Sequence, residues 1–179
     1  TTEPGASVTV RGPDGAAVPV TVAPDGSITG SIAAPALAGN YTATATDING
    51  NTATDTATAT DSTPPAVELN VVINADGSAT LSGTTEPGAT LIVQGPDGAA
   101  VPVTVAPDGS ITGSIAAPAL AGNYTATATD INGNIASDTA IATDSTPPAV
   151  ELNVVINADG TATLSGTTEP GASVTVQDP

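Results

Sequence analysis

The feature that most constrains this chain is an internal repeat with a period of 83 residues. Residues 1–83 align with residues 84–166 without a gap and differ at only eight positions, which are 7, 8, 9, 11, 52, 54, 58 and 78. A third copy begins at Thr167 and continues to Pro179. Such self-similarity predicts a tandem array of structural units rather than one large core. This chain is therefore expected to be a window on a longer array.

The boundary between units is predicted from the stretch "TDSTPPAV", which occurs at 60–67 and again at 143–150. Two consecutive prolines fix φ and remove two backbone donors, so this stretch is expected to be extended and to end a strand ladder. The expected organisation is a partial repeat at 1–61 that lacks its first two strands, a complete repeat at 62–144, and the first strands of a third repeat at 145–179.

Within the complete repeat, seven segments alternate apolar and polar residues, which predicts β-strands. Gly, Pro, Asn and Asp cluster between the segments and predict turns. Asp138 falls in register with Ala136 and Ala140, so the last strand is expected to carry a bulge or to lie at a sheet edge. Seven short strands in this length predict an all-β, antiparallel β-sandwich. The seven segments are 66–73, 78–84, 90–94, 101–105, 110–115, 123–129 and 135–143.

Tyr124 and its repeat Tyr41 open the sixth predicted strand, and they are the only aromatic residues. In a sandwich this position often holds a tyrosine corner, whose hydroxyl bonds back to the backbone. The alternative is that each ring simply fills a small core.

Composition excludes several classes of function. The chain has no Cys, His, Met, Trp or Phe, one basic residue (Arg11) and a formal net charge of -17. Because catalysis usually draws on His, Cys or Lys, an enzyme is not expected. The negative charge opposes binding to nucleic acid and to anionic lipid. No apolar run is long enough to span a bilayer, and any targeting signal is expected outside this stretch.

Strand parity predicts where the acidic loops lie, because antiparallel neighbours reverse direction at every turn. Three loops of the complete repeat should return to the pole that follows the first linker; they carry Glu86, Asp108 and Asp130, and linker residue Asp61 lies beside them. The opposite pole should hold Asp76, Asp97 and Asp144. Each junction is therefore expected to be lined by carboxylates from two repeats.

The loop "DINGN", at 47–51 and 130–134, is the candidate metal-binding element. Ca²⁺ takes six to eight oxygen ligands, and Asp130 and Asn132 would join Asp61 and Glu86 in supplying them. The alternative is that Asn-Gly makes a type I′ hairpin turn which Asp caps. The "PDG" and "ADG" sequences are expected to be turns only.

The motifs "SGTTEPGATLIVQGPDG", "AGNYTATATDINGN" and "ATDSTPP" resemble the bacterial immunoglobulin-like extender repeats of giant RTX-type biofilm adhesins. The resemblance implies tandem seven-stranded immunoglobulin-like β-sandwiches joined end to end, export by type I secretion to the bacterial cell surface, and Ca²⁺ at the domain junctions. By position it implies junction ligands at Asp47, Asp130, Asp61, Asp144, Glu3, Glu86 and Glu169.

The expected function is a structural extender that holds terminal binding modules away from the cell. A module that binds carbohydrate or protein is the main alternative; an ice-binding face of Thr-Ala strands and a carboxylate-pair glycosidase are two further alternatives. The expected partners are neighbouring repeats of the same chain. Head-to-tail strand complementation between copies is also expected, because residues 145–166 contain the two strands that residues 1–61 lack.

Overall fold

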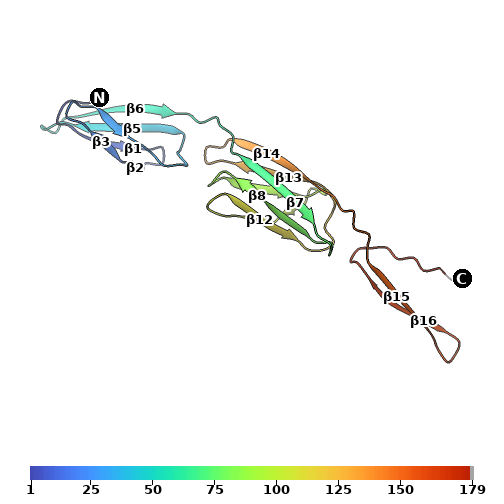
Figure 1. Cartoon of the computed structure of the whole chain (residues 1–179). Coiled ribbons are helices and arrows are strands. Elements are labelled where there is room, and N and C mark those ends of the chain that lie inside the picture. Colours follow the sequence, from blue (N-terminus) through green and yellow to red (C-terminus); the bar gives the residue numbers. More distant parts are fainter. Residues whose placement is uncertain (178–179) are drawn as a thin grey trace. The chain divides into compact units, whose positions relative to one another are not determined.

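The computed structural model describes residues 1–177, in which every regular element is a β-strand (Figure 1). Neighbouring strands such as β1 and β5, β8 and β12, and β7 and β8 pair in antiparallel fashion. Contacts divide the chain into two units, one of residues 1–65 with 129–135 and one of residues 66–128 with 136 onward. None of the described residues forms a helix long and apolar enough to cross a membrane.

Residues 66–144 form two four-stranded sheets, in the orders β10-β9-β13-β14 and β11-β12-β8-β7. β14 is an edge strand of the first sheet, and β7 is an edge strand of the second. The strands are β7 (Val67–Ile73), β8 (Ala79–Thr85), β9 (Thr90–Gln94), β10 (Ala100–Val101), β11 (Val103–Val105), β12 (Ser110–Ile115), β13 (Gly122–Thr129) and β14 (Ile135–Ala142).

The predicted strand at 101–105 is wrong in one respect, because the structure breaks it at Pro102 into β10 and β11. β10 pairs with β9, whereas β11 pairs with β12 in the other sheet. Proline has no N–H for a ladder, so it marks the point at which the chain crosses from one sheet to the other. The repeat thus has eight strands where the alternation predicted seven.

The core lies between the two sheets of this repeat, and it follows the predicted alternation. Leu81 of β8 and Val93 of β9 are each 1% exposed, although they come from different sheets. The core is completed by small side chains, since Ala126 of β13 is fully buried. The buried cluster contains Leu69, Val71, Ala79, Leu81, Val93, Tyr124, Ala126 and Ala142.

Tyr124 forms the predicted tyrosine corner. Its side chain is 1% exposed, and its hydroxyl donates to the backbone carbonyl of Leu120 at 2.8 Å. Burial, and secondarily the negative charge of Asp97, raises the pKa of the Tyr124 hydroxyl. Tyr41 donates to the Leu37 carbonyl at the same distance. The Tyr124 ring therefore fills the core, and its hydroxyl gives a loop carbonyl a hydrogen-bond donor.

Asp138 lies on edge strand β14, as predicted, and the strand continues through it from Ile135 to Ala142. Its carboxylate Oδ2 accepts a hydrogen bond from the backbone N–H of Leu69 at 2.8 Å. Leu69 belongs to β7, the edge strand of the other sheet. Asp138 thus accepts a hydrogen bond from a backbone N–H of edge strand β7, and this bond links the edge strands of the two sheets.

Residues 1–59 repeat only part of this architecture. One sheet has the order β2-β1-β5-β6, and the second sheet consists of β3 and β4 alone (Figure 1). The strands are β1 (Ser7–Arg11), β2 (Ala17–Val18), β3 (Val20–Val22), β4 (Ile28–Gly30), β5 (Gly39–Thr46) and β6 (Thr52–Ala59). Among the described residues, β3 and β4 of this second sheet pair with each other.

The third segment contains a hairpin of β15 (Val150–Ile156) and β16 (Ala162–Thr168). Its register runs from Val150 opposite Thr168 to Ile156 opposite Ala162. This is the register of β7 with β8, displaced by one period of 83 residues. The hairpin therefore forms the same local pairing without the rest of a sandwich around it.

We predict that Asp138→Ala destabilises the complete repeat by about 1.5–3 kcal/mol, the usual range for a hydrogen bond to a charged group. The substitution leaves the Leu69 N–H without an acceptor. Glu68→Ala is the matched control, because it removes one negative charge from an exposed position of β7. Urea unfolding of the two variants measures the difference; equal midpoints would contradict the role assigned to Asp138.

Candidate functional site

Within the complete repeat, backbone hydrogen bonds join two loops at each pole. The N–H of Thr85 donates to the carbonyl of Gly109 at 2.8 Å, which joins the β8–β9 loop to the β11–β12 loop. At the opposite pole the N–H of Ala119 donates to the carbonyl of Gly77 at 2.8 Å. Gly109 has a φ of 86°, and a Cβ there would overlap the Thr85 carbonyl oxygen. Glycine is therefore required for this loop contact.

The "DINGN" loop is a five-residue hairpin connection that differs from the predicted type I′ turn. In the first copy the N–H of Asp47 donates to Asn51 O at 2.9 Å, and the N–H of Gly50 donates to Asp47 O at 3.1 Å. Gly50 has a φ of 87°, while no non-glycine residue described has positive φ. A type I′ turn needs positive φ at both central residues, so this loop is instead a tight turn followed by a glycine in the left-handed region.

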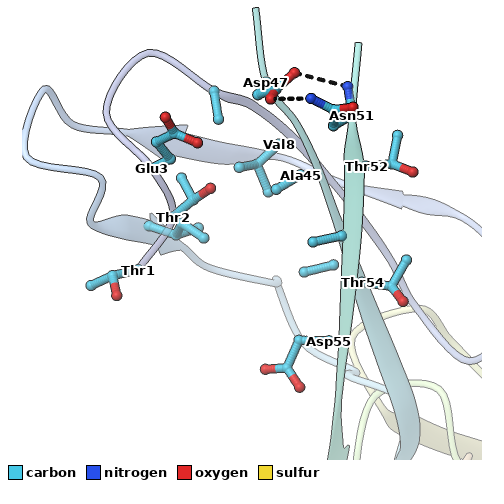
Figure 2. Close-up of a pocket in the computed structure, with 14 residues that line it drawn as sticks. Thr1, Thr2, Glu3, Val8, Ala45, Asp47, Asn51, Thr52, Thr54 and Asp55 are labelled. Carbon is cyan, nitrogen blue, oxygen red and sulfur yellow. Dashed lines mark hydrogen bonds between the residues drawn. The ribbon is translucent and has the colours of Figure 1, made fainter. Parts of the chain in front are cut away.

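The aspartate of this loop holds the loop itself together. Asp130 Oδ1 accepts the N–H groups of Asn132 and Asn134, each at 2.8 Å, and Oδ2 accepts the Asn134 side-chain amide at 2.8 Å. Asp47 makes the same three contacts in the first copy, and two of its contacts with Asn51 are drawn in Figure 2. The repeated Asp and Asn residues thus have a structural role in each loop.

These hydrogen bonds lower the pKa of the Asp130 carboxyl from its ordinary value of 3.8; the bond from the Asn134 side chain contributes most, and partial desolvation opposes it. The pKa of Asp47 is lowered for the same leading reason, the bond from Asn51. Hydrogen bonds to an ionised carboxylate favour that form. Both loops therefore prefer a charged aspartate.

Asn132 contacts its predicted neighbour Asp61 and two backbone groups that its sequence motif did not predict. Its Nδ2 donates to Asp61 Oδ2 at 2.8 Å and to the carbonyl of Ala36 at 3.1 Å, while its Oδ1 accepts the N–H of Ala38 at 2.7 Å. All of these residues belong to the first unit. Because Ala36 and Ala38 take part through backbone atoms, their side chains gave no sequence signal for this contact.

Asp61, the predicted linker ligand, also accepts the N–H of Thr63 at 3.0 Å. The bond from Thr63 and the bond from Asn132 lower the pKa of Asp61, whereas the negative charge of Asp130 raises it. The structure therefore brings Asp61 and Asp130 within electrostatic reach of each other, as predicted. In the second linker Asp144 makes the corresponding bond with the N–H of Thr146 at 2.9 Å.

The three glutamates of the "EPGA" motif lie in equivalent turns. The N–H of Ala89 donates to the Glu86 carbonyl at 3.0 Å, and Glu3 and Glu169 accept in the same way. Pro at the second and Gly at the third position suit a type II turn, and Gly88 has a φ of 89°. In the first unit Glu3 and Asp47 line one hollow (Figure 2). Glu169 lies beside Gly77 in the second unit.

The described residues do not assemble a complete calcium site. No group of three or more Asp or Glu residues that can hold a metal ion occurs among residues 1–177. Asp130 uses both carboxylate oxygens within its own loop, and Asn132 presents its NH₂ group, not its oxygen, to Asp61. In this arrangement the side chains fall short of the six to eight oxygens that Ca²⁺ takes.

The "PDG" and "ADG" sequences are turns, as predicted. The N–H of Gly98 donates to Gly95 O at 2.9 Å, and that of Gly77 donates to Asn74 O at 3.0 Å. The aspartate of each turn accepts a backbone N–H two residues on, at 3.0 Å for both Asp97 and Asp76. These carboxylates stabilise local turns.

Residues 64–144 match the family model of the bacterial Ig domain. The match agrees with the two-sheet fold of this repeat and confirms the predicted resemblance to bacterial immunoglobulin-like repeats. A search of curated proteins gave no match.

The chain is also similar to solved structures that include the following three, each with a low TM-score. A tetra-tandem repeat in the extending region of a large adhesion protein is 31% identical over 93% of this chain and 49% of its own, with a TM-score of 0.48. The BSP domain of a biofilm associated protein is 23% identical over 79% and 25%, with a TM-score of 0.34. Extracellular domains 3–5 of Drosophila OTK are 17% identical over 78% and 51%, with a TM-score of 0.36.

We predict a pH dependence from the lowered pKa of Asp130. A lowered folded-state pKa contributes stability that is complete above the unfolded value and is lost as the pH falls through the folded value. The stability difference between the native chain and Asp130→Asn should therefore be largest near neutral pH and should shrink below pH 3.8. Thermal melts across this range measure it, and a difference that is independent of pH would contradict the role of the ionised carboxylate.

Proposed function

We propose that this chain is an extender segment of a bacterial cell-surface adhesin. The observation that carries the proposal is the repetition of one domain with one register: β15 pairs with β16 as β7 pairs with β8, and only eight positions differ between the first two copies. Repeats that are nearly identical multiply length without adding a distinct binding site to each copy. This role is the one named for the extending region of the adhesion protein described above.

The two tyrosines favour the extender over a module that binds carbohydrate or protein. Recognition surfaces commonly use aromatic side chains as anchors. Here both hydroxyls donate to backbone carbonyls of their own repeat, and the Tyr124 ring is buried in the core. The only aromatic residues of the sequence are therefore used to build the domain.

The charge of the chain suits a long segment surrounded by water. The net charge is -17 with one basic residue, and turn carboxylates such as Asp76 and Asp97 are exposed. Like charges keep neighbouring repeats solvated and oppose association between them. We place the segment outside the cell and propose export by type I secretion, in keeping with the family that its motifs resemble.

An extender should gain a constant length with each added repeat. Inserting one more copy of residues 62–144 is expected to lengthen the molecule by about 30–40 Å, since strands rise about 3.3 Å per residue and turns lie at both poles. Small-angle scattering of chains with increasing numbers of repeats measures this increment. Maximum dimensions that stay constant as repeats are added would contradict the proposal.

Calcium at the junctions is the further part of this proposal. Its support is the contact of Asp61 with the Asp130 loop, whose Asn132 donates to Asp61 Oδ2 at 2.8 Å. The bonds from Thr63 and Asn132 lower the pKa of Asp61, and the negative charge of Asp130 opposes this lowering. A cation that compensates both carboxylates would need Asn132 to turn its amide so that the oxygen replaces the NH₂ group. Ca²⁺ suits this cluster better than Mg²⁺, because it tolerates irregular geometry.

We predict that Ca²⁺ raises the melting temperature more than Mg²⁺ does, because an ion that binds only the folded state stabilises it. Asp61→Asn should reduce the effect, since it removes one charge while it keeps an oxygen for the Thr63 N–H. Asp14→Asn is the matched control, because Asp14 accepts only the N–H of Ala16 in a turn. Identical melts in Ca²⁺ and in a chelator would remove calcium from the proposal.

A further inference from the structure

The differences between the first two copies gather on one surface of the domain. Six of the eight positions that differ carry exposed residues of β9 and β14, which alternate with more buried residues of the same strands. β9 and β14 lie on either side of β13, whose sequence is the same as that of β5. The two copies therefore share a core and differ in one surface. The six residues are Thr90, Ile92, Gln94, Ile135, Ser137 and Ile141.

This surface is the side of the β10-β9-β13-β14 sheet that points away from the core, and we call it the outer face. Its residues alternate along each strand with core residues such as Val93 and Tyr124. In the complete repeat it consists of Thr90, Ile92 and Gln94 of β9, Asn123, Thr125, Thr127 and Thr129 of β13, and Ile135, Ser137, Thr139 and Ile141 of β14.

The complete repeat has a more apolar outer face than the first copy. Ile92 is 62% exposed and Ile141 is 70% exposed, whereas the first copy has threonine at both positions. The central strand adds threonine methyl groups between these isoleucines, and the Oγ1 atoms of Thr125 and Thr139 lie 3.4 Å apart on neighbouring strands. Large exposed apolar side chains that gather on one surface are typical of an interaction site.

The outer face is also uncharged, although the chain has a net charge of -17. The carboxylates of the complete repeat lie in turns, in the linker or on edge strands. Asp76 and Asp97 are in turns, Glu68 is on β7 of the other sheet, and Asp138 is bonded to the N–H of Leu69. Because like charges repel, two copies of this chain approach each other most favourably through a face without carboxylates.

We infer that the outer face of the complete repeat packs against the same face of a second copy, so that extenders associate side by side. A charged partner would find no opposite charge on this face, whereas a second copy presents the same uncharged isoleucine and threonine side chains. Two sheets can stack face to face about 10 Å apart. The same surface is used by both molecules, so the contact is isologous. This interaction goes beyond the extender role, since it joins separate molecules.

The contact of one repeat is small, so the association depends on conditions and on length. Three strands about 4.8 Å apart, with at most eight residues that each rise about 3.3 Å, give a face of roughly 400 Å². A stable interface buries about 800 Å² per partner. The net charge opposes the contact at low ionic strength, and salt screens this repulsion. Each further repeat with the same face strengthens the association through multivalency.

The first test measures molar mass by light scattering over a wide range of protein concentration, in low and in high NaCl. The mass should rise above 16.9 kDa with concentration, and more so in high salt. Ile92→Thr combined with Ile141→Thr should weaken the association about tenfold, since four isoleucine side chains leave the paired faces. The first copy already has threonine at these positions, so Thr9→Ile with Thr58→Ile should have the opposite effect.

Val72→Thr is the matched control, because Val72 is 50% exposed on β7 of the other sheet. Melting temperatures of all variants show whether the fold is retained. A mass that stays at 16.9 kDa at every salt concentration would overturn the inference. So would an association that the two isoleucine substitutions leave unchanged, or that Val72→Thr weakens to the same extent.

The second test locates the contact without any substitution. Amide chemical shifts of the native chain are recorded by NMR as the protein is concentrated in high salt. The signals of Ile92, Thr127 and Ser137 on the outer face should move with concentration. Those of Ser82 and Thr112, which are exposed on the other sheet, should stay constant. Shifts of equal size on both sheets, or on the other sheet alone, would contradict the contact.

Discussion

The closure of two sheets over one small core is the constraint on which the rest of this structure depends. The core contains Leu, Val, Ile, Ala and one Tyr, so it is buried only when all of its walls are present. Leu81 of β8 is 1% exposed inside the complete repeat, and its equivalent Leu164 is 49% exposed in the isolated hairpin. The same sequence thus loses its burial when the facing sheet is missing. A small apolar core makes each repeat dependent on every one of its strands.

Polar side chains add stability to this small core, because they satisfy backbone groups at strand edges and in loops. Asp138 satisfies an edge N–H, the Tyr124 hydroxyl satisfies a loop carbonyl, and Asp130 satisfies two N–H groups of its own hairpin. Unpaired backbone groups in such positions would each destabilise the fold. The acidic side chains therefore act mainly as acceptors for turns and edges. Their net charge has the separate effect of keeping the repeats apart in solution.

Much of the fold was predictable from the sequence because it follows from local rules. Period-two alternation identified the strands, Gly and Pro marked the turns, and the position of Tyr124 indicated the corner. The break at Pro102 was missed because apolar alternation continues through it, although proline itself was the signal. The partners of Asp138 and Asn132 were also missed. The missed partners, Leu69 of Asp138 and Ala36 and Ala38 of Asn132, take part through backbone groups distant in sequence, and no side-chain pattern reports them.

Hydrogen exchange at the two copies of one strand tests the central claim most directly, since Ser27–Ile32 and Ser110–Ile115 have the same sequence. At low protein concentration, the amides along both edges of β12 should be protected, because β12 lies between β11 and β8. In β4 only the amides that face β3 should be protected, and the others should exchange as in an open strand. Equal protection of the two segments would show that the protection of β12 does not depend on its pairing with β8, and it would contradict the account.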